Sequence, residues 1–306
     1  MGKTAFLFAG QGAQYSGMGK SLYDTNDAAK ALYDAAEKLR PGTMAQSFSG
    51  TAEELKQTAN TQPCLYLVDL ASALALEAAG IHADAAAGFS LGEIAALAFA
   101  DVYSAEDGFK IVTERGRLMQ EAAEAADTAM CAVVKLDAQT VADTAAQFEQ
   151  LYAVNFNCPG QTVVSGLSSS MPAFTEKIKE LKGRCIPLAV SAAFHSPFMA
   201  DASEKFGAAL ADYTFKESRI PVYANLTAQP YETGRTRETM QQQMANPVRW
   251  QMTIENMIAE GFTDFIEVGA GKTLSGLVKK ISADVRIFHV EDADTLAETN
   301  EAVKNA

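Results

Sequence analysis

Short apolar segments alternate with longer helical patterns along most of the chain, and this order strongly limits the possible folds. The apolar segments have the length of buried strands, and the segments between them have the length and periodicity of helices. Such an alternation is typical of an α/β protein with a mostly parallel sheet. We expect strands of this sheet at residues 4–8, 85–88, 222–225, 264–268 and 285–290.

The region from residue 128 to residue 193 has a different order. Its pattern predicts a strand, a helix, two strands, a helix and a strand, which is the split βαβ arrangement of a ferredoxin-like domain. We therefore predict a small ferredoxin-like domain at residues 128–193. It would be inserted into a large α/β catalytic domain formed by residues 1–127 and 194–306.

Charge and hydropathy exclude several classes of protein. The chain carries 25 Lys and Arg residues against 38 Asp and Glu residues, a formal net charge of −13, whereas nucleic-acid binding needs a clustered basic surface. No segment has the apolar length of a signal-peptide core or a membrane span, and the cysteines form no C-x-x-C pair. We expect a cytoplasmic monomer with reduced thiols that binds neither nucleic acid nor membrane.

A Gly-x-Ser-x-Gly pentapeptide at residues 88–92 makes Ser90 the first candidate for chemistry. It follows a predicted strand and opens a predicted helix, the context in which this motif forms a sharp turn that exposes the serine hydroxyl. The Leu91 amide would point with the helix N-terminus toward an oxyanion formed at Ser90. This context predicts an α/β-hydrolase-like core; the alternative is a turn that only packs the helix on the strand.

Three histidines limit the search for a base. His82 follows a helix in a solvated turn, and His289 lies inside an apolar strand, where a structural role is favoured. His195 lies between a predicted strand and a predicted helix, at the sheet edge where α/β proteins place their chemistry. No acidic residue between Ser90 and His195 clearly ends a strand of the large sheet. Either a backbone carbonyl orients the histidine or the order of the triad differs.

Seven separated motifs follow one another in an order that is specific to one family. They are GQGAQ at 10–14, GFSLGE at 88–93, RGRLMQ at 115–120, NFNCPGQ at 155–161, AFHS at 193–196, NPVRW at 246–250 and EVGAGK at 267–272. From about residue 4 to residue 280 the chain resembles the malonyl-CoA:acyl carrier protein transacylase family. This family includes the acyltransferase domains of fatty acid and polyketide synthases.

The resemblance implies roles for the residues at matching positions. Ser90 would be the acyl-accepting nucleophile, and His195 would be its general base and acid. The backbone N–H groups of Gln11 and Leu91 would form the oxyanion hole.

Two arginines, Arg115 and Arg117, lie in one predicted helix with acidic neighbours available to pair with either. A guanidinium is planar and matches a carboxylate with two parallel donors, but the residues alone do not choose between the two. The resemblance assigns binding of the free malonyl carboxylate to Arg115. It also implies that the main-chain carbonyl of Arg249 holds the ring of His195, which would explain the missing acidic residue.

Phe194 directly precedes the predicted base. In the resembled family a bulky aromatic residue at this position accompanies malonyl selectivity, and a small residue accompanies methylmalonyl selectivity. Steric exclusion of one methyl group contributes about 1–3 kcal/mol. We therefore expect a preference for malonyl-CoA, with simple core packing as the alternative explanation of the aromatic ring.

The function implied by the resemblance is transfer of a malonyl group from malonyl-CoA to the phosphopantetheine thiol of acyl carrier protein. The transfer would pass through a malonyl-Ser90 ester in a ping-pong sequence and would supply fatty acid synthesis, with no metal or redox cofactor. The alternatives are an acyltransferase of a polyketide assembly line, a serine (thio)esterase and a noncatalytic acyltransferase-like module.

Both coenzyme A and acyl carrier protein are acidic, so a chain of net charge −13 needs local positive charge to bind them. Two groups of basic residues are candidates, and each could instead be an ordinary solvated face. They are Lys177, Lys179, Lys182 and Arg184 in the small domain, and Lys272, Lys279 and Lys280 in the large domain.

Overall fold

The computed structural model describes residues 2–190 and 192–304. The larger of its two sheets has five strands. The strand order is β7-β2-β1-β8-β9, and every neighbouring pair is parallel. All five predicted strands are present, which confirms a mixed α/β fold with a parallel sheet. Their bounds are β1 Lys3–Phe8, β2 Ala85–Gly88, β7 Val222–Tyr223, β8 Phe262–Val268 and β9 Arg286–Val290.

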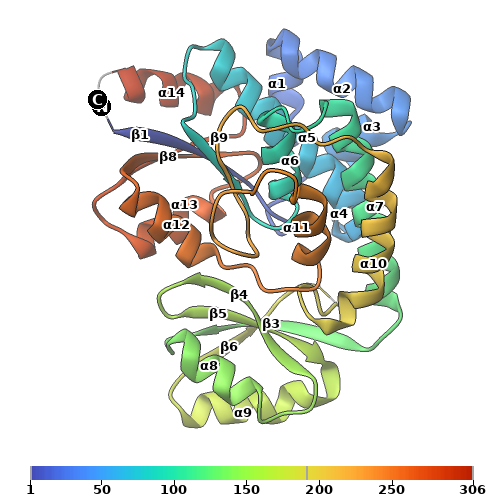
Figure 1. Ribbon diagram of the computed structural model, residues 1–306, viewed down its shortest axis with the longest axis vertical. Helices are drawn as coiled ribbons and strands as arrows, with labels where there is room; N and C mark the ends of the chain where they lie inside the picture. The colour runs from blue at the N-terminus through green and yellow to red at the C-terminus, as the bar shows by residue number, and fades with distance from the viewer. Residues whose placement is uncertain (1, 191, 305–306) are drawn as a thin grey trace.

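Helices cover both faces of the parallel sheet (Figure 1). Twelve of the described α-helices belong to this part of the chain. They are α1 Lys20–Thr25, α2 Asp27–Leu39, α3 Thr43–Ser49, α4 Ala52–Lys56, α5 Thr58–Ala78, α6 Gly92–Phe99, α7 Ala105–Glu124, α10 Ala200–Ala209, α11 Thr236–Gln243, α12 Trp250–Ala259, α13 Thr273–Ile281 and α14 Ala293–Lys304, with the 3-10 turns η2 Pro197–Met199 and η3 Leu210–Asp212.

The central strand β1 contributes to two separate parts of the core. Ala5 and Leu7 pack in the cluster formed with α12 and α13, whereas Phe6 and Phe8 pack in the cluster formed with α5, α6 and α7. All four side chains are at most 1% exposed. A parallel strand that helices cover on both faces is apolar at consecutive positions, which explains the unbroken apolar run of this strand.

A four-stranded antiparallel sheet forms the second layer, drawn in green and yellow in the lower part of Figure 1. Its strand order is β4-β5-β3-β6. Apolar residues of α8 and α9 cover one face, as Val141 and Phe174 pack against Val133 and Val164. The elements are β3 Thr128–Val134, α8 Ala138–Ala145, β4 Leu151–Cys158, β5 Gln161–Leu167, η1 Ser168–Ser170, α9 Met171–Glu180 and β6 Arg184–Pro187.

The structure differs from the predicted helices in two ways. We predict a helix from Pro63, with the proline in its first turn, but α5 begins at Thr58 and Pro63 lies inside it. The proline lacks one backbone donor, and the burial of most of α5 outweighs this loss. Five further helices, α1 to α4 and α11, were not predicted. Four of them have five to eight residues, whereas α2 has 13 residues and a buried apolar face.

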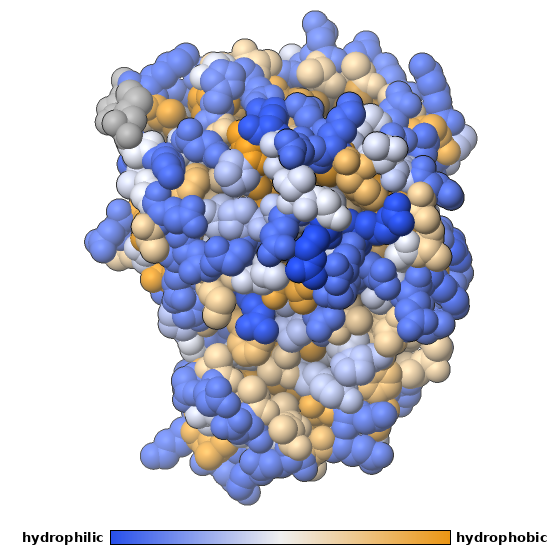
Figure 2. Space-filling view, viewed as in Figure 1, coloured by the Kyte–Doolittle hydropathy of each residue, from blue (hydrophilic) through white to orange (hydrophobic). Residues whose placement is uncertain are grey.

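The thiols and the surface agree with the composition. All four cysteines are free, and only Cys185 is not fully buried. Hydrophilic residues cover much of the face shown in Figure 2. Among residues 2–190 and 192–304, every helix is too short or too polar to cross a bilayer.

Candidate active site

The Gly-x-Ser-x-Gly motif forms a tight turn between β2 and α6. Ser90 adopts a left-handed conformation with φ of 54°, which is uncommon for a residue with a side chain. A Cβ atom at Gly88 would lie 2.0 Å from the carbonyl carbon of Gly92, and one at Gly92 would lie 2.3 Å from the carbonyl oxygen of Phe8. Both glycines are therefore required for the close approach of β1, β2 and α6.

His195 contacts the serine directly. The distance between Ser90 Oγ and His195 Nε2 is 2.8 Å, and the His195 side chain is buried. On the other side of the ring, Nδ1 lies 3.0 Å from the backbone carbonyl oxygen of Gln243. A carbonyl only accepts hydrogen bonds, so Nδ1 carries the proton and Nε2 is free to accept the serine proton.

The protonation state of His195 suits a base. Burial, followed by the nearby positive charge of Arg115, lowers the pKa of His195 to about 4. The imidazole is consequently neutral at pH 7, and its Nε2 lone pair is available to the Ser90 hydroxyl.

The residue that orients the histidine differs from our prediction. We expected the main-chain carbonyl of Arg249 in this place, and that expectation is wrong. The Arg249 carbonyl accepts from the backbone N–H and the hydroxyl of Thr253, within the first turn of α12. The Gln243 carbonyl lies at the end of α11, where helix carbonyls lack intrahelical partners, and it takes the role instead.

Arg115 projects from α7 into the centre of the site and is fully buried. Its Nη2 donates to Ser90 Oγ at 3.1 Å and to Gln243 Oε1 at 2.8 Å, while Nη1 donates to Gln62 Oε1 at 2.9 Å. Burial lowers the pKa of Arg115 to about 10, so the guanidinium remains charged at pH 7. A cation is thus fixed beside the serine hydroxyl.

Arg117 has a different environment, as the ion-paired alternative predicts. It is half exposed on the outer side of α7 and pairs with Glu114 and Glu121. The three-dimensional arrangement therefore separates the two arginines that the residues alone could not separate.

Gln11 and Leu91 carry the two backbone N–H groups that we expect to form the oxyanion hole. Gln11 follows β1, and Leu91 is the N-cap residue of α6. Within residues 2–190 and 192–304, no protein acceptor takes a hydrogen bond from either backbone N–H. Two unengaged amides next to a serine are suited to bind an oxyanion.

A cavity of about 670 Å³ opens above these residues. Its wall includes Gln11, Ser90, Phe194 and His195 from the parallel part of the molecule, and Met130 from β3 of the antiparallel sheet. The predicted selectivity residue Phe194 therefore lies in the same cavity as the serine. Neighbouring groups of three or more His, Cys, Asp or Glu side chains arranged to hold a metal ion are absent from the described part of the chain.

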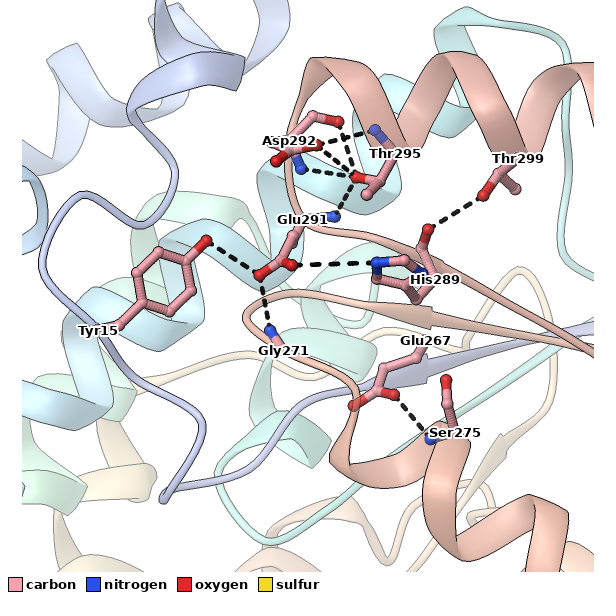
Figure 3. A network of polar contacts seen from close by, with 9 residues as sticks. All are labelled: Tyr15, Glu267, Gly271, Ser275, His289, Glu291, Asp292, Thr295 and Thr299. Carbon is pink, nitrogen blue, oxygen red and sulfur yellow. Dashed lines mark hydrogen bonds and ion pairs between the residues drawn. The ribbon is translucent and has the colours of Figure 1, made fainter.

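A polar network lies just beyond the carboxyl end of β9 and reaches this cavity through Tyr15 (Figure 3). Tyr15 lines the cavity, and its hydroxyl donates to Glu291 at 2.9 Å. Glu291 also accepts from the backbone N–H of Gly271 at 2.9 Å. His289 points toward Glu291 with 3.9 Å between Nε2 and Oε1, in agreement with the structural role that we favoured for it.

Sequence reasoning misses three buried polar residues that complete the site. Gln62 and Gln243 hold Arg115, and Gln243 Nε2 also donates to the Ser90 carbonyl at 2.8 Å. Asn225 Oδ1 accepts from the backbone N–H of Ser90 at 2.7 Å. Gln243 lies in a polar helix and Asn225 follows a two-residue strand, so neither position carries a periodic signal of burial.

The fold and the site together define an acyl-transfer enzyme, because the site combines a serine hydroxyl on a tight turn that lines a cavity, a neutral base and a fixed cation. Comparison with protein families agrees, since residues 5–293 match the acyl transferase domain. The chain belongs to this acyltransferase family, which confirms the resemblance found in the motifs.

Relatives and solved structures of this family are similar over their whole length. The malonyl CoA-acyl carrier protein transacylase of Bacillus subtilis is 41% identical, over 97% of this chain and 96% of that protein. The protein of the same name from Synechocystis is 36% identical, over 96% of this chain and 99% of that protein.

Two solved structures show the same similarity in three dimensions. The malonyl CoA-acyl carrier protein transacylase of Clostridium perfringens superposes with a TM-score of 0.94 at 34% identity, covering 99% of this chain and 98% of that one. A malonyl-transacylase in complex with a type II polyketide acyl-carrier protein gives a TM-score of 0.94 at 30% identity, covering 98% and 99%.

Proposed function

We propose that this acyltransferase moves a malonyl group from malonyl-CoA to the phosphopantetheine thiol of acyl carrier protein, and so supplies fatty acid synthesis. The observation that carries the proposal is the buried Arg115 guanidinium, which lies 3.1 Å from Ser90 Oγ. A fixed cation beside the acyl-accepting hydroxyl selects an acyl group that ends in a carboxylate. The names of the relatives support the same donor and acceptor.

In the first half of the proposed reaction, His195 removes the proton of the Ser90 hydroxyl as the oxygen attacks the thioester carbonyl. The amides of Gln11 and Leu91 stabilise the tetrahedral oxyanion. Coenzyme A leaves as a thiol after His195 returns the proton, and the malonyl group remains as an ester on Ser90. Arg115 holds its free carboxylate.

In the second half, the carrier-protein thiol attacks the ester, and His195 again moves the proton. Every step uses side chains or backbone amides of this chain, so the proposed chemistry calls for no metal or redox cofactor. The Gln243 carbonyl keeps the proton on Nδ1 throughout, and this replaces the acidic residue of a serine triad.

The proposed acyl selectivity rests on Phe194, which is 8% exposed and lines the cavity. Its ring would occupy the space that the additional methyl group of methylmalonyl-CoA needs, so we expect malonyl-CoA to be preferred by about tenfold to a hundredfold. A role in a polyketide assembly line is the second candidate, because one structural neighbour is bound to a polyketide carrier protein.

Incubation with malonyl-CoA followed by intact-mass measurement tests the proposal. The expected result is one malonyl adduct per chain, which maps to Ser90 and is absent from Ser90→Ala. Absence of the adduct from the unaltered enzyme, or its persistence in Ser90→Ala, would contradict the proposed intermediate.

We also propose a division of the chain into two domains. The element order β3-α8-β4-β5-α9-β6 and the strand order β4-β5-β3-β6 support an inserted ferredoxin-like domain at residues 128–193. The turn at Ser90 supports an α/β-hydrolase-like core at residues 1–127 and 194–306. We further propose a cytoplasmic monomer.

A further inference from the structure

A buried carboxylate, Glu93, lies directly behind the Ser90 turn. It belongs to the first turn of α6 and is fully buried. Oε2 accepts from the backbone N–H of Asn225 at 2.6 Å, and Oε1 accepts from the Tyr231 hydroxyl. Burial raises the pKa of Glu93 to about 7, although these hydrogen bonds and the charge of Arg115 oppose the rise. Burying an acid is costly, and the proposed reaction gives this one no task.

Asn225 connects Glu93 to the nucleophile. Its Nδ2 donates to the carbonyl oxygen of Gly88 at 2.6 Å, and its Oδ1 accepts from the N–H of Ser90 at 2.7 Å. One side chain thus joins both ends of the turn in which Ser90 has its left-handed conformation. Such a conformation persists only where surrounding contacts hold it.

Glu93 also acts on Arg115. The hydrogen-bond partners of the Arg115 side chain are the neutral residues Gln62, Gln243 and Ser90. The strongest charge acting on the guanidinium is that of Glu93, which opposes the lowering of the Arg115 pKa by burial. Both charged groups contact the Ser90 turn: Glu93 reaches it through Asn225, and Arg115 donates to Ser90 Oγ.

We propose that Glu93 and Asn225 form a positioning pair for the acyl-transfer site. Asn225 clamps the Ser90 turn, while Glu93 anchors Asn225 and supplies the counter-charge that keeps Arg115 beside Ser90 before substrate binds. The inference rests on the proposed function, in which Arg115 receives the malonyl carboxylate.

The counter-charge has a consequence for substrate binding. A malonyl carboxylate that reaches Arg115 becomes a second anion near one cation, so Glu93 weakens the binding of anionic acyl groups. Neutral acyl groups, such as acetyl, do not experience this repulsion. Glu93 therefore keeps the arginine in place at the expense of some affinity for malonyl-CoA.

Asn225→Ala tests the clamp in single-turnover acylation of Ser90, with rates expressed per enzyme molecule that finally carries the adduct. We expect the rate constant to fall about 100-fold with both malonyl-CoA and acetyl-CoA, because a serine displaced by about 1 Å reacts that much more slowly. Asn225→Ser, which retains one hydrogen-bonding group, should give an intermediate rate. An unchanged rate constant in either variant would overturn the clamp.

The matched control is Asn256→Ala. Asn256 lies on α12, and its Nδ2 donates to the carbonyl oxygen of Ala228 at 2.8 Å. Ala228 follows Asn225 by three residues, but this hydrogen bond does not involve the Ser90 turn. Asn256→Ala loses a side-chain hydrogen bond to a backbone carbonyl, as Asn225→Ala does at Gly88. We expect its acylation rate constant to stay within about twofold of the unaltered enzyme.

Glu93→Gln tests the counter-charge, because glutamine keeps an acceptor for Asn225 and removes the negative charge. At pH 8, one unit above the Glu93 pKa of about 7, the half-saturating malonyl-CoA concentration should fall by up to about tenfold, because protonation of Glu93 relieves any larger repulsion. The value for acetyl-CoA should not change. Tyr231→Phe removes one hydrogen bond that stabilises the Glu93 charge, and should move the malonyl-CoA value in the same direction by a smaller factor.

Equal changes for both substrates, or weaker binding of malonyl-CoA, in Glu93→Gln and Tyr231→Phe would overturn the counter-charge. The unaltered enzyme separates this inference from the proposed function. If it forms no malonyl adduct, the proposed function fails. If it forms the adduct normally while the four variants behave like Asn256→Ala, only the positioning pair fails.

Discussion

At the scale of single residues, the chemistry depends on a few side chains brought together from distant parts of the chain. Ser90 and His195 were predictable, because one lies in a motif with a strict structural context and the other is one of three histidines. Gln243 was not, since a glutamine in the polar helix α11 resembles a solvated residue until tertiary contacts bury it. The carbonyl that orients His195 was assigned to Arg249 by resemblance and proved to be that of Gln243, because sequence does not locate a backbone oxygen.

Removal of the guanidinium is the most informative change at this scale. For Arg115→Ala we expect the second-order rate constant with malonyl-CoA to fall at least about 100-fold, because a buried carboxylate would lose its partner. The loss with acetyl-CoA should be about threefold or less, since acetyl has no carboxylate. Initial rates with both thioesters measure the difference, and equal losses would refute a role in carboxylate binding.

The low pKa of His195 makes a separate prediction for stability. The unfolded chain binds a proton at the ordinary histidine pKa of about 6.5, whereas the folded chain binds it only near pH 4. The unfolded state is thus favoured as the pH falls below 6.5. His195→Asn lacks this contribution. Between pH 7 and pH 5 its unfolding free energy should therefore decrease by about 2 kcal/mol less than that of the unaltered protein.

Urea titrations of both proteins at the two pH values measure that difference. Glu93 and Asp69, whose buried carboxyls have raised pKa values, are present in both proteins, so their opposite contributions cancel. A pH-independent difference between the proteins would show that His195 titrates normally.

At the scale of elements, strands were predicted better than helices. The strands of the parallel sheet lie in short apolar runs that helices cover on both faces, so their positions can be read from the sequence. The starts of helices depend on competing local contacts, as in α5, where Pro63 suggested a later start than the true one. The short helices α1, α3 and α4 have five to seven residues, too few for a helical period to show. The 13-residue helix α2 does carry a periodic apolar face, with Ala29, Leu32, Tyr33 and Ala36 buried, and was missed all the same.

The junction of β1, β2 and α6 allows a test at this scale. In Gly92→Ala the added methyl group would lie 2.3 Å from the carbonyl oxygen of Phe8, a backbone atom that cannot move aside cheaply. We expect the unfolding free energy to fall by about 4 kcal/mol or more. Gly276→Ala in α13 is the matched control, because nothing lies within 4 Å of its new methyl group.

The control should raise the unfolding free energy by up to about 1 kcal/mol, as expected when glycine is replaced by alanine in a helix. Urea denaturation followed by circular dichroism compares the two variants. Comparable stabilities would mean that the glycines of the Ser90 turn are dispensable.

At the scale of the whole molecule, the charge of −13 requires that acidic partners find local positive charge. In the antiparallel unit, Lys177 and Lys179 pair with Glu180 and Glu176, which reduces their attraction for an anion. Lys279 and Lys280 are exposed at the end of α13. The same helix borders a side cavity that shares Gln11, Phe89 and Asn155 with the main one.

We therefore expect acyl carrier protein to bind this enzyme through the exposed lysines of α13. Reversing both charges in Lys279→Glu with Lys280→Glu should raise the KM for acyl carrier protein about tenfold and change kcat less than about twofold, since exposed charges act mainly on encounter. The matched control is Lys177→Glu with Lys179→Glu. A larger effect in the control than in the α13 variant would assign docking to the antiparallel unit.

The central claim is that Ser90 carries a malonyl group from a thioester to a carrier-protein thiol, and discharge of the loaded enzyme tests it most directly. The malonyl-enzyme is isolated, divided, and mixed with buffer or with acyl carrier protein that bears phosphopantetheine, and the adduct is followed by intact mass. We predict rapid loss of malonyl from Ser90 with a matching gain on the carrier protein, and slow loss in buffer alone. Equal rates of loss in both, with no malonyl gained by the carrier protein, would make the chain a thioesterase and contradict the account.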